Sequence, residues 1–152
     1  MFHETLRPFL NDLVREHQHM HTLVFALRDK LEQGKQSHWT EQAAVNAGEA
    51  LSQLRNYAAQ HFEHEEDDGC FEDAIAIMPS CGPHVDALRQ EHREILSALD
   101  RFQAAADLDE NRPEYWSLFA GQLEELLVQL VAHERREGRL IAEVFNVAPD
   151  DT

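Results

Sequence analysis

The chain has 152 residues, 43% of them hydrophobic, so we expect a single domain over residues 1–152, with a core from about 5 to 146. The formal net charge of −16 disfavours nucleic acid and anionic membrane surfaces as partners. No apolar stretch approaches the roughly 18 residues of a membrane span, and the N-terminal stretch MFHETLRPFL lacks the apolar core of a signal peptide, so we expect a cytoplasmic protein.

Three groups of turn residues divide the chain. They are EQGKQSHWTEQ, in which Thr40 can cap a following helix, IMPSCGPH, and DLDENRPEYW. The four segments around them are each roughly 25 to 35 residues long and show no strand alternation, which is typical of long helices joined by short turns. The predicted fold is all-α, an antiparallel up-down-up-down four-helix bundle.

Each segment has two rows of apolar residues that repeat every seven positions, as on the inward-facing stripe of a bundle helix. In the first segment, for example, the rows contain Leu10, Val24 and Leu31, and Leu13, Met20 and Leu27. Six polar residues interrupt these rows: His17, His61, Glu65, His92, His133 and Glu137. Counted from the turns, they lie at the same level to within about 4–6 Å, at 1.5 Å rise per residue. We therefore expect them in one buried layer, with His64 and Glu66 outside the rows.

The remaining histidines are weaker candidates for this layer. His21, one turn after His17, is a possible additional ligand, whereas His84 is expected at a helix start and His38 outside the layer. His3, His19 and His64 are predicted to be solvated. The residues that precede two of the layer histidines, Glu16 and Glu91, are either surface charges or acceptors for an imidazole N–H.

Other residues are predicted to pack rather than to react. These are Cys70 and Cys81, which form no CxxC pair, and aromatic residues such as Phe25, Phe62, Trp116 and Phe145. Leu127, Val128 and Val131 extend the apolar stripe of the last segment, which favours either a homodimer face or a wide core stripe.

The chain also contains an internal repeat. Glu16-His17 aligns with Glu91-His92, 75 positions later, and the HxxxE pair at residues 61–65 aligns with the one at 133–137, 72 positions later. Two helix pairs that each supply one His and one HxxxE would face each other about a pseudo-two-fold axis. This symmetry is a natural basis for a two-metal site.

Burial of four imidazoles and two carboxylates costs several kcal/mol per charged group unless each has a partner. A polar network in which every donor and acceptor is satisfied is one solution. Metal ligation is the other, and it satisfies all six residues at once, because the two glutamates can bridge two ions. With a bridging oxide or hydroxide, two six-coordinate ions keep two positions for small molecules or water. Mixed imidazole and carboxylate ligation favours iron, with zinc and manganese as alternatives.

The pattern of His17, His61-x-x-x-Glu65, His92 and His133-x-x-x-Glu137 resembles the hemerythrin-like (HHE cation-binding) domain over roughly residues 5–146. The resemblance implies a four-helix bundle with two non-haem iron ions. It also implies a role in binding O2, sensing oxygen, redox state or iron, or responding to nitrosative stress and damaged iron-sulfur centres.

The pattern departs from that of the O2-carrying hemerythrins, which have an HxxxH pair on the third helix. Here Leu88 and Leu96 stand four positions from His92, so His21 and water are the candidates for the remaining coordination position. We expect a protein that binds or senses O2, NO or redox state. The alternatives are a di-iron oxidase or peroxidase, a stress-response protein for iron storage or repair, and a structural zinc or metal-free bundle.

Overall fold

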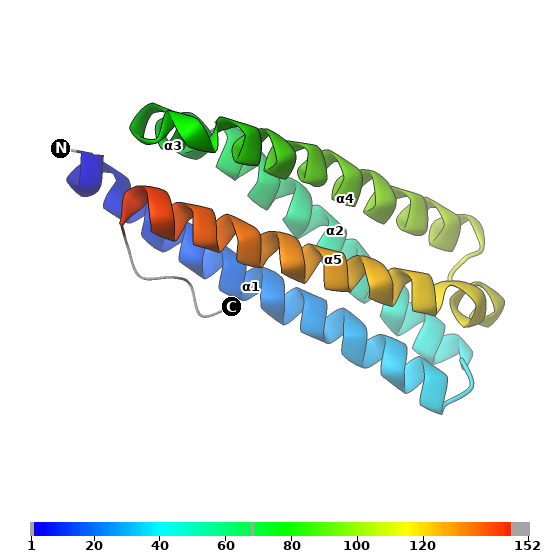
Figure 1. Cartoon of the computed structure of the whole chain (residues 1–152). Helices are drawn as coiled ribbons and strands as arrows, with labels where there is room; N and C mark the ends of the chain where they lie inside the picture. Colours follow the sequence, from blue (N-terminus) through cyan, green and yellow to red (C-terminus); the bar gives the residue numbers. More distant parts are fainter. Residues whose placement is uncertain (1, 68, 147–152) are drawn as a thin grey trace.

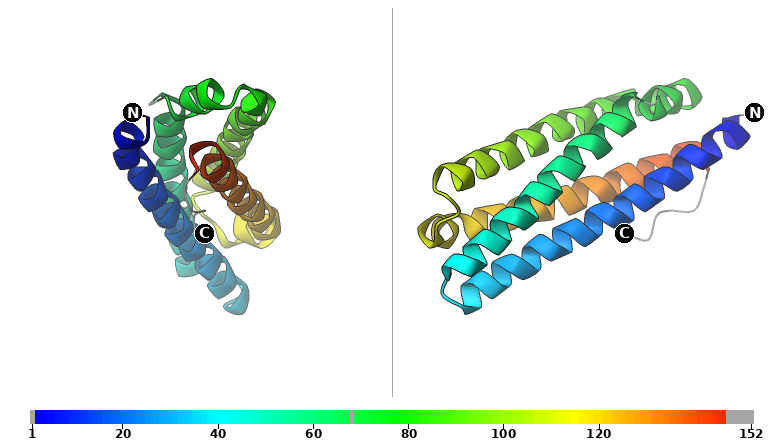
Figure 2. Two further views of the ribbon diagram at one scale, coloured as in Figure 1. Left: turned by 60° about the vertical axis from the view of Figure 1, so that its left-hand side comes forward. Right: turned by 180° about the vertical axis from the view of Figure 1, so that it is seen from behind.

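The computed structural model describes residues 2–67 and 69–146, with side chains from residue 10 onward. It contains four long helices, α1 (Phe2–Gln36), α2 (Glu41–Asp67), α4 (Gly82–Leu108) and α5 (Pro113–Phe145). These helices lie lengthwise beside one another, while the short helix α3 (Cys70–Ile77) and the 3-10 turn η1 (Pro79–Cys81) cross from the end of α2 to the start of α4 (Figures 1 and 2). The all-helical prediction is confirmed, since the described residues form no strand.

The second segment differs from the prediction, because HEEDDGCFEDAI does not continue α2 as one helix. The chain turns at Gly69, whose φ of 82° lies in the left-handed region that glycine adopts without a Cβ clash. A separate helix, α3, then brings Cys70 and Phe71 into the core. The described chain thus has five α-helices where four were expected.

The first turn depends on a close contact between Gly34 and Trp39. Thr40 caps α2 as predicted, since its hydroxyl accepts a hydrogen bond from the Ala43 N–H at 3.2 Å. Gly34, however, lies inside α1, and a Cβ there would come within 2.4 Å of the Trp39 ring. That ring is 7% exposed and stacks on Trp116 with a centroid separation of 5.7 Å. The glycine is therefore required by packing rather than by helix termination.

Buried apolar side chains form two clusters. The larger cluster spans α1, α2, α4 and α5 and includes Met20, Leu27, Leu54, Phe62, Ile95, Leu99, Trp116 and Leu130. The smaller cluster lies at the α3 end and includes Leu13, Cys70, Phe71, Val85, Leu88, Leu140 and Phe145. Along α1 the smaller cluster ends at Leu13 and the larger one begins at Met20, with His17 between them. The polar layer therefore separates the two clusters.

Most of the predicted packing residues are buried. Phe62, Trp116 and Phe145 are each at most 1% exposed, but the prediction for Phe25 is wrong, since 69% of its surface is exposed. Leu127 is buried and Val131 half-buried, which favours the wide core stripe on α5, whereas Val128 is 59% exposed and lies outside that stripe.

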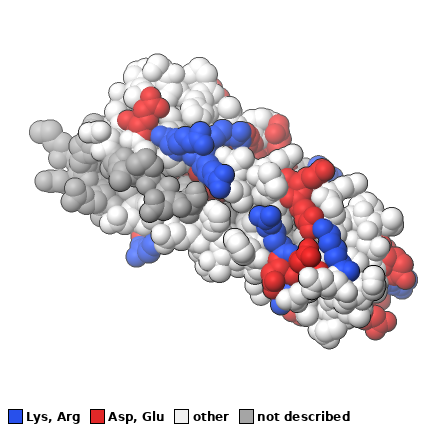
Figure 3. Space-filling model, turned by 60° about the horizontal axis from the view of Figure 1, so that its bottom comes forward, with Lys and Arg blue, Asp and Glu red and all other residues white. Residues whose placement is uncertain are grey.

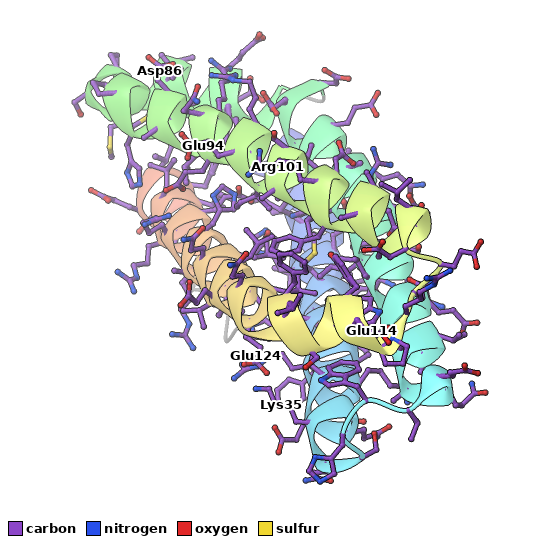
Figure 4. The ribbon with its side chains drawn as sticks, turned by 90° about the vertical axis from the view of Figure 1, so that its right-hand side faces the viewer. Lys35, Asp86, Glu94, Arg101, Glu114 and Glu124 are labelled. Atoms are coloured by element: carbon purple, nitrogen blue, oxygen red, sulfur yellow. The ribbon has the colours of Figure 1, made fainter. Side chains whose placement is uncertain are left out.

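Charged side chains of both signs cover the outer surface. On the face shown in Figure 3, acidic and basic side chains lie among one another. Lys35 of α1 donates to Glu124 of α5 at 2.7 Å, and Figure 4 shows the pair at the junction of these helices. Among the described residues, no helix combines the length and the apolar character needed to cross a membrane.

The substitution Gly34→Ala is expected to destabilise the protein by about 1–3 kcal/mol, because the added methyl group overlaps a tryptophan ring that the core holds in place. The matched control is Gly121→Ala on α5. A Cβ at Gly121 meets nothing within 4 Å, so this change should stabilise the helix by about 0.5–1 kcal/mol. Urea unfolding measures the change in the free energy of unfolding for both variants. Equal changes would contradict the packing argument.

The Cys70 thiol is expected to be unreactive in the folded protein. It is 1% exposed, and its burial together with the Glu65 carboxylate raises its pKa to about 12. Since the thiolate is the reactive species, iodoacetamide should label this residue slowly at mildly alkaline pH and rapidly in denaturant. Peptide mass spectrometry would measure the labelling, and a folded-state rate like that of a free cysteine would refute the expectation.

Candidate metal centre

The six residues that interrupt the apolar rows come together in one buried layer. α1 contributes His17, α2 and α5 each contribute an HxxxE pair, and α4 contributes His92. The four-residue spacing places both side chains of each pair on one helix face. All six are at most 1% exposed. Their role as metal ligands stays a prediction, and the geometry described below is the evidence for it.

The four histidines form two pairs. The ring centroids of His17 and His61 lie 5.0 Å apart, and those of His92 and His133 lie 4.7 Å apart. Glu137 lies between the pairs. Its Oε1 is 3.0 Å from His17 Nε2, while its Oε2 is 3.2 Å from Nε2 of both His92 and His133.

Glu65 also spans the two histidine pairs. Its Oε1 lies 3.3 Å from His61 Nε2 and 3.4 Å from His92 Nε2, and its Oε2 lies 3.5 Å from His17 Nε2. Two central carboxylates are therefore each in contact with both histidine pairs.

Carboxylates hold the outer nitrogens of two histidines. His61 Nδ1–H donates to Glu16 at 3.1 Å, and His133 Nδ1–H donates to Glu91 at 2.8 Å. A carboxylate only accepts hydrogen bonds, so each Nδ1 carries a proton, and Nε2 faces inward, where its lone pair can bind a metal once the ring is neutral. The structure thus decides between the two sequence interpretations of Glu16 and Glu91, because both accept an imidazole N–H.

Residues outside the apolar rows also support the layer. Glu66 accepts a hydrogen bond from His92 Nδ1–H at 3.0 Å. His64 was predicted to be solvated, which is wrong, since it is half-buried and its Nδ1 lies 2.6 Å from Glu16. Burial alone would raise the pKa of Glu16, but the hydrogen bonds and charges of His61 and His64 hold it below its ordinary value.

One residue of the layer, Glu134, lies outside the two predicted apolar rows of its segment. It is 2% exposed, and its Oε2 lies 2.9 Å from His17 Nε2 and 3.5 Å from His61 Nε2. A third row of α5 contains it, at seven-residue intervals with the buried residues Ala120, Leu127 and Ile141. The wide apolar stripe that includes Leu127 was the signal that could have revealed it.

The carboxylates make the two HxxxE histidines electrostatically different. Burial lowers the pKa of His61, but the nearby carboxylates, above all Glu65 and Glu134, outweigh burial and raise it to about 9. Burial likewise lowers the pKa of His133, and here the hydrogen bond to Glu91 does not compensate, so the pKa stays below its ordinary value.

Several polar atoms that face the interior of the layer have no hydrogen-bond partner among the described residues. They are His61 Nε2, His133 Nε2, Glu65 Oε1 and both oxygens of Glu134. Some of these atoms lie close to one another, but not in hydrogen-bond alignment. Buried polar atoms without partners are costly, and cations bound between them would remove that cost.

Two groups of side chains could each hold a metal ion, because the potential ligand atoms within each group all lie within 4.8 Å of one another. One contains His17, His61, Glu134 and Glu137, and the other contains His92, His133 and Glu137. His21 belongs to neither group. Imidazole nitrogens and carboxylate oxygens are suitable ligands for iron and other divalent metals, so the residues present fit a metal site.

The comparison with protein families agrees with this geometry. A family model described as the hemerythrin HHE cation binding domain matches residues 9–145. The match includes every residue of the layer and the carboxylates that hold it. Comparisons with curated proteins and with solved structures gave no significant match.

Loss of an outer carboxylate is expected to weaken metal binding. Glu16→Ala and Glu91→Ala should each lower metal affinity by about 10–100-fold, because the histidine ring loses the acceptor that orients it. Glu63→Ala, an exposed position on α2, serves as the control. Competition titration with a chromophoric chelator measures the affinities. Values like that of the control would show that these hydrogen bonds are dispensable.

Proposed function

Because the chain belongs to the hemerythrin HHE cation-binding domain family, we propose that its buried layer binds two iron ions and that the protein binds or senses O2, NO or redox state through them. The observation that supports this proposal best is the set of inward-facing imidazole and carboxylate atoms that lack hydrogen-bond partners. The proposed fold around them is an antiparallel up-down-up-down bundle formed by α1, α2, α4 and α5.

The geometry suggests how the ligands are shared. His17 and His61 would hold one ion, and His92 and His133 the other. Glu65 and Glu137 would bridge them, since each carboxylate contacts both histidine pairs. Every one of these residues lies within the matched region.

The donor set favours iron over the alternatives, zinc and manganese. All contacting atoms are imidazole nitrogens or carboxylate oxygens, and neither potential ligand group contains a cysteine. Structural zinc sites usually have four ligands and often thiolates. A bound iron pair supplies redox chemistry and coordination positions for small molecules.

The protein's own residues orient the ligands and exclude water. Outer carboxylates fix the histidine rings, and the two apolar clusters border the layer on either side. Phe62 stacks on His92 at a centroid distance of 4.0 Å, and Phe71 lies 5.8 Å from the same ring. Side chains that are at most 2% exposed suit a diatomic ligand better than an organic substrate. This enclosure favours a small ligand over an organic substrate, and the turnover test below separates binding or sensing from an oxidase or peroxidase.

The proposal predicts about two iron ions per chain after anaerobic reconstitution, together with near-ultraviolet charge-transfer absorption. Ions that bind only the native state at 1,000 times their Kd stabilise it by about 4 kcal/mol each. Removal of iron should therefore lower Tm by roughly 10 °C or more for a chain of this size. Elemental analysis and calorimetry measure the two effects.

Variants distinguish metal binding by the predicted ligands from unspecific metal binding elsewhere on the protein. Glu65→Ala and Glu137→Ala should each abolish the paired site, whereas Glu63→Ala should retain it. An unchanged melting curve after verified metal removal would argue against the site. Sustained turnover of peroxide or O2 would favour the oxidase or peroxidase alternative, and more than two irons per chain would favour storage.

A further inference from the structure

The two halves of the chain place equivalent residues around the layer. The offsets of 75 and 72 positions pair His17 with His92, Glu16 with Glu91, His61 with His133, His64 with Arg136, and Glu65 with Glu137. The contacts repeat as well. Glu16 joins His61 to His64, and Glu91 joins His133 to Arg136. The surroundings of the two histidine pairs therefore match in these contacts, although Glu66, which accepts the His92 Nδ1–H, has Gly138 as its equivalent.

One equivalent pair in the layer differs in chemical class. Glu134 stands where the first half has Phe62, 72 positions earlier. Glu134 contacts His17 and His61 through its carboxylate. Phe62 stacks on His92 and lies edge-on to the His133 ring, at centroid distances of 4.0 and 5.5 Å. One histidine pair therefore has a third carboxylate beside it, and the other has an aromatic ring.

Glu134 has the properties of an unused ligand. It is 2% exposed, it points at His17 Nε2, and neither of its oxygens has a hydrogen-bond partner among the described residues. Burial of an ionised carboxylate without hydrogen bonds costs several kcal/mol unless a positive charge compensates it. A metal ion held by His17 and His61 would supply that charge.

We infer that the two ion positions are unequal: Glu134 binds the ion held by His17 and His61, and an added small ligand binds at the ion held by His92 and His133. This inference rests on the function proposed above and assigns the ligand position within it. The additional donor lies beside His17 and His61, so the position open to a ligand belongs to the α4–α5 pair.

A hollow in the surface reaches one histidine of this pair, His133. It measures about 440 Å³, lies between α4 and α5, and is lined by His133, Glu91, Arg136 and the small residues Ala98 and Ala132. Glu94 and Arg101, which also line it, appear along α4 in Figure 4. The positions equivalent to the two alanines carry larger side chains, Leu23 and Gln60. The hollow gives a small ligand a route to the His92–His133 side.

Iron-loaded protein titrated with azide tests the assignment. Wild type should hold two irons, show two Mössbauer doublets of equal area and bind one azide per iron pair. Glu134→Ala should lower the affinity for one of the two iron ions at least about tenfold and shift only one of the two doublets. This variant should also bind a second azide per iron pair. Glu134→Gln keeps the side-chain volume and should therefore fold even if the alanine variant does not. It should lower the affinity for the same iron ion.

The control is Glu63→Ala, an exposed position on α2, which should retain two irons and one azide. If both Glu134 variants keep the wild-type iron affinities, both doublets and a single azide, Glu134 is not a ligand and the inference is overturned. If wild type fails to hold two irons, the proposed function fails and this inference fails with it, and metal analysis alone distinguishes that result.

The route has its own test. Ala132→Leu should slow azide association several-fold in stopped-flow measurements without changing iron content, because the larger side chain fills the hollow. Gln60→Leu, at the equivalent position on α2, should leave the rate unchanged. Equal rates in the two variants would show that the ligand does not enter between α4 and α5.

Discussion

The structure depends on one constraint, the burial of four imidazoles and three carboxylates in a single layer between apolar clusters. Bulk water solvates these groups very little, because each is at most 2% exposed. The chain pairs the outer Nδ1 of His61, His92 and His133 with carboxylates, but several inner atoms remain without hydrogen bonds among the described residues. Ions shared by the inner atoms would compensate the layer's charge, and the helix spacing places the donors around them.

Much of the layer could be predicted from the sequence, because each long helix has a strong seven-residue apolar period. A polar residue that interrupts such a period, such as His17 or His92, must either be buried or break the helix, so its position is informative. Glu134 was missed because α5 was read as two apolar rows, whereas it has three. The end of α2 was missed because nothing in the local pattern shows that Gly69 takes a positive φ. His64 and Glu66 were underestimated because long side chains outside the rows reach neighbouring helices.

The internal repeat gives both histidine pairs the same framework, in which one histidine ring of each pair is oriented by a glutamate of a neighbouring helix. Within that framework, the difference between Phe62 and Glu134 places a third carboxylate beside one histidine pair only. Three carboxylates around one ion would favour a higher charge there than at its neighbour. A repeated helix pair can in this way acquire two distinct coordination environments without any change in the backbone.

The separation of the two apolar clusters has a consequence for how the protein opens. The smaller cluster contains α3 and the adjoining ends of α1, α4 and α5, whereas the larger one contains the remaining lengths of the long helices. Each cluster is contiguous, so each has the character of a separate cooperative unit. The smaller unit has fewer buried apolar side chains, so we expect local opening of the metal-free chain to begin at the α3 end. Bound ions, held by residues of all four long helices, would merge the two units into one and make that opening as rare as global unfolding.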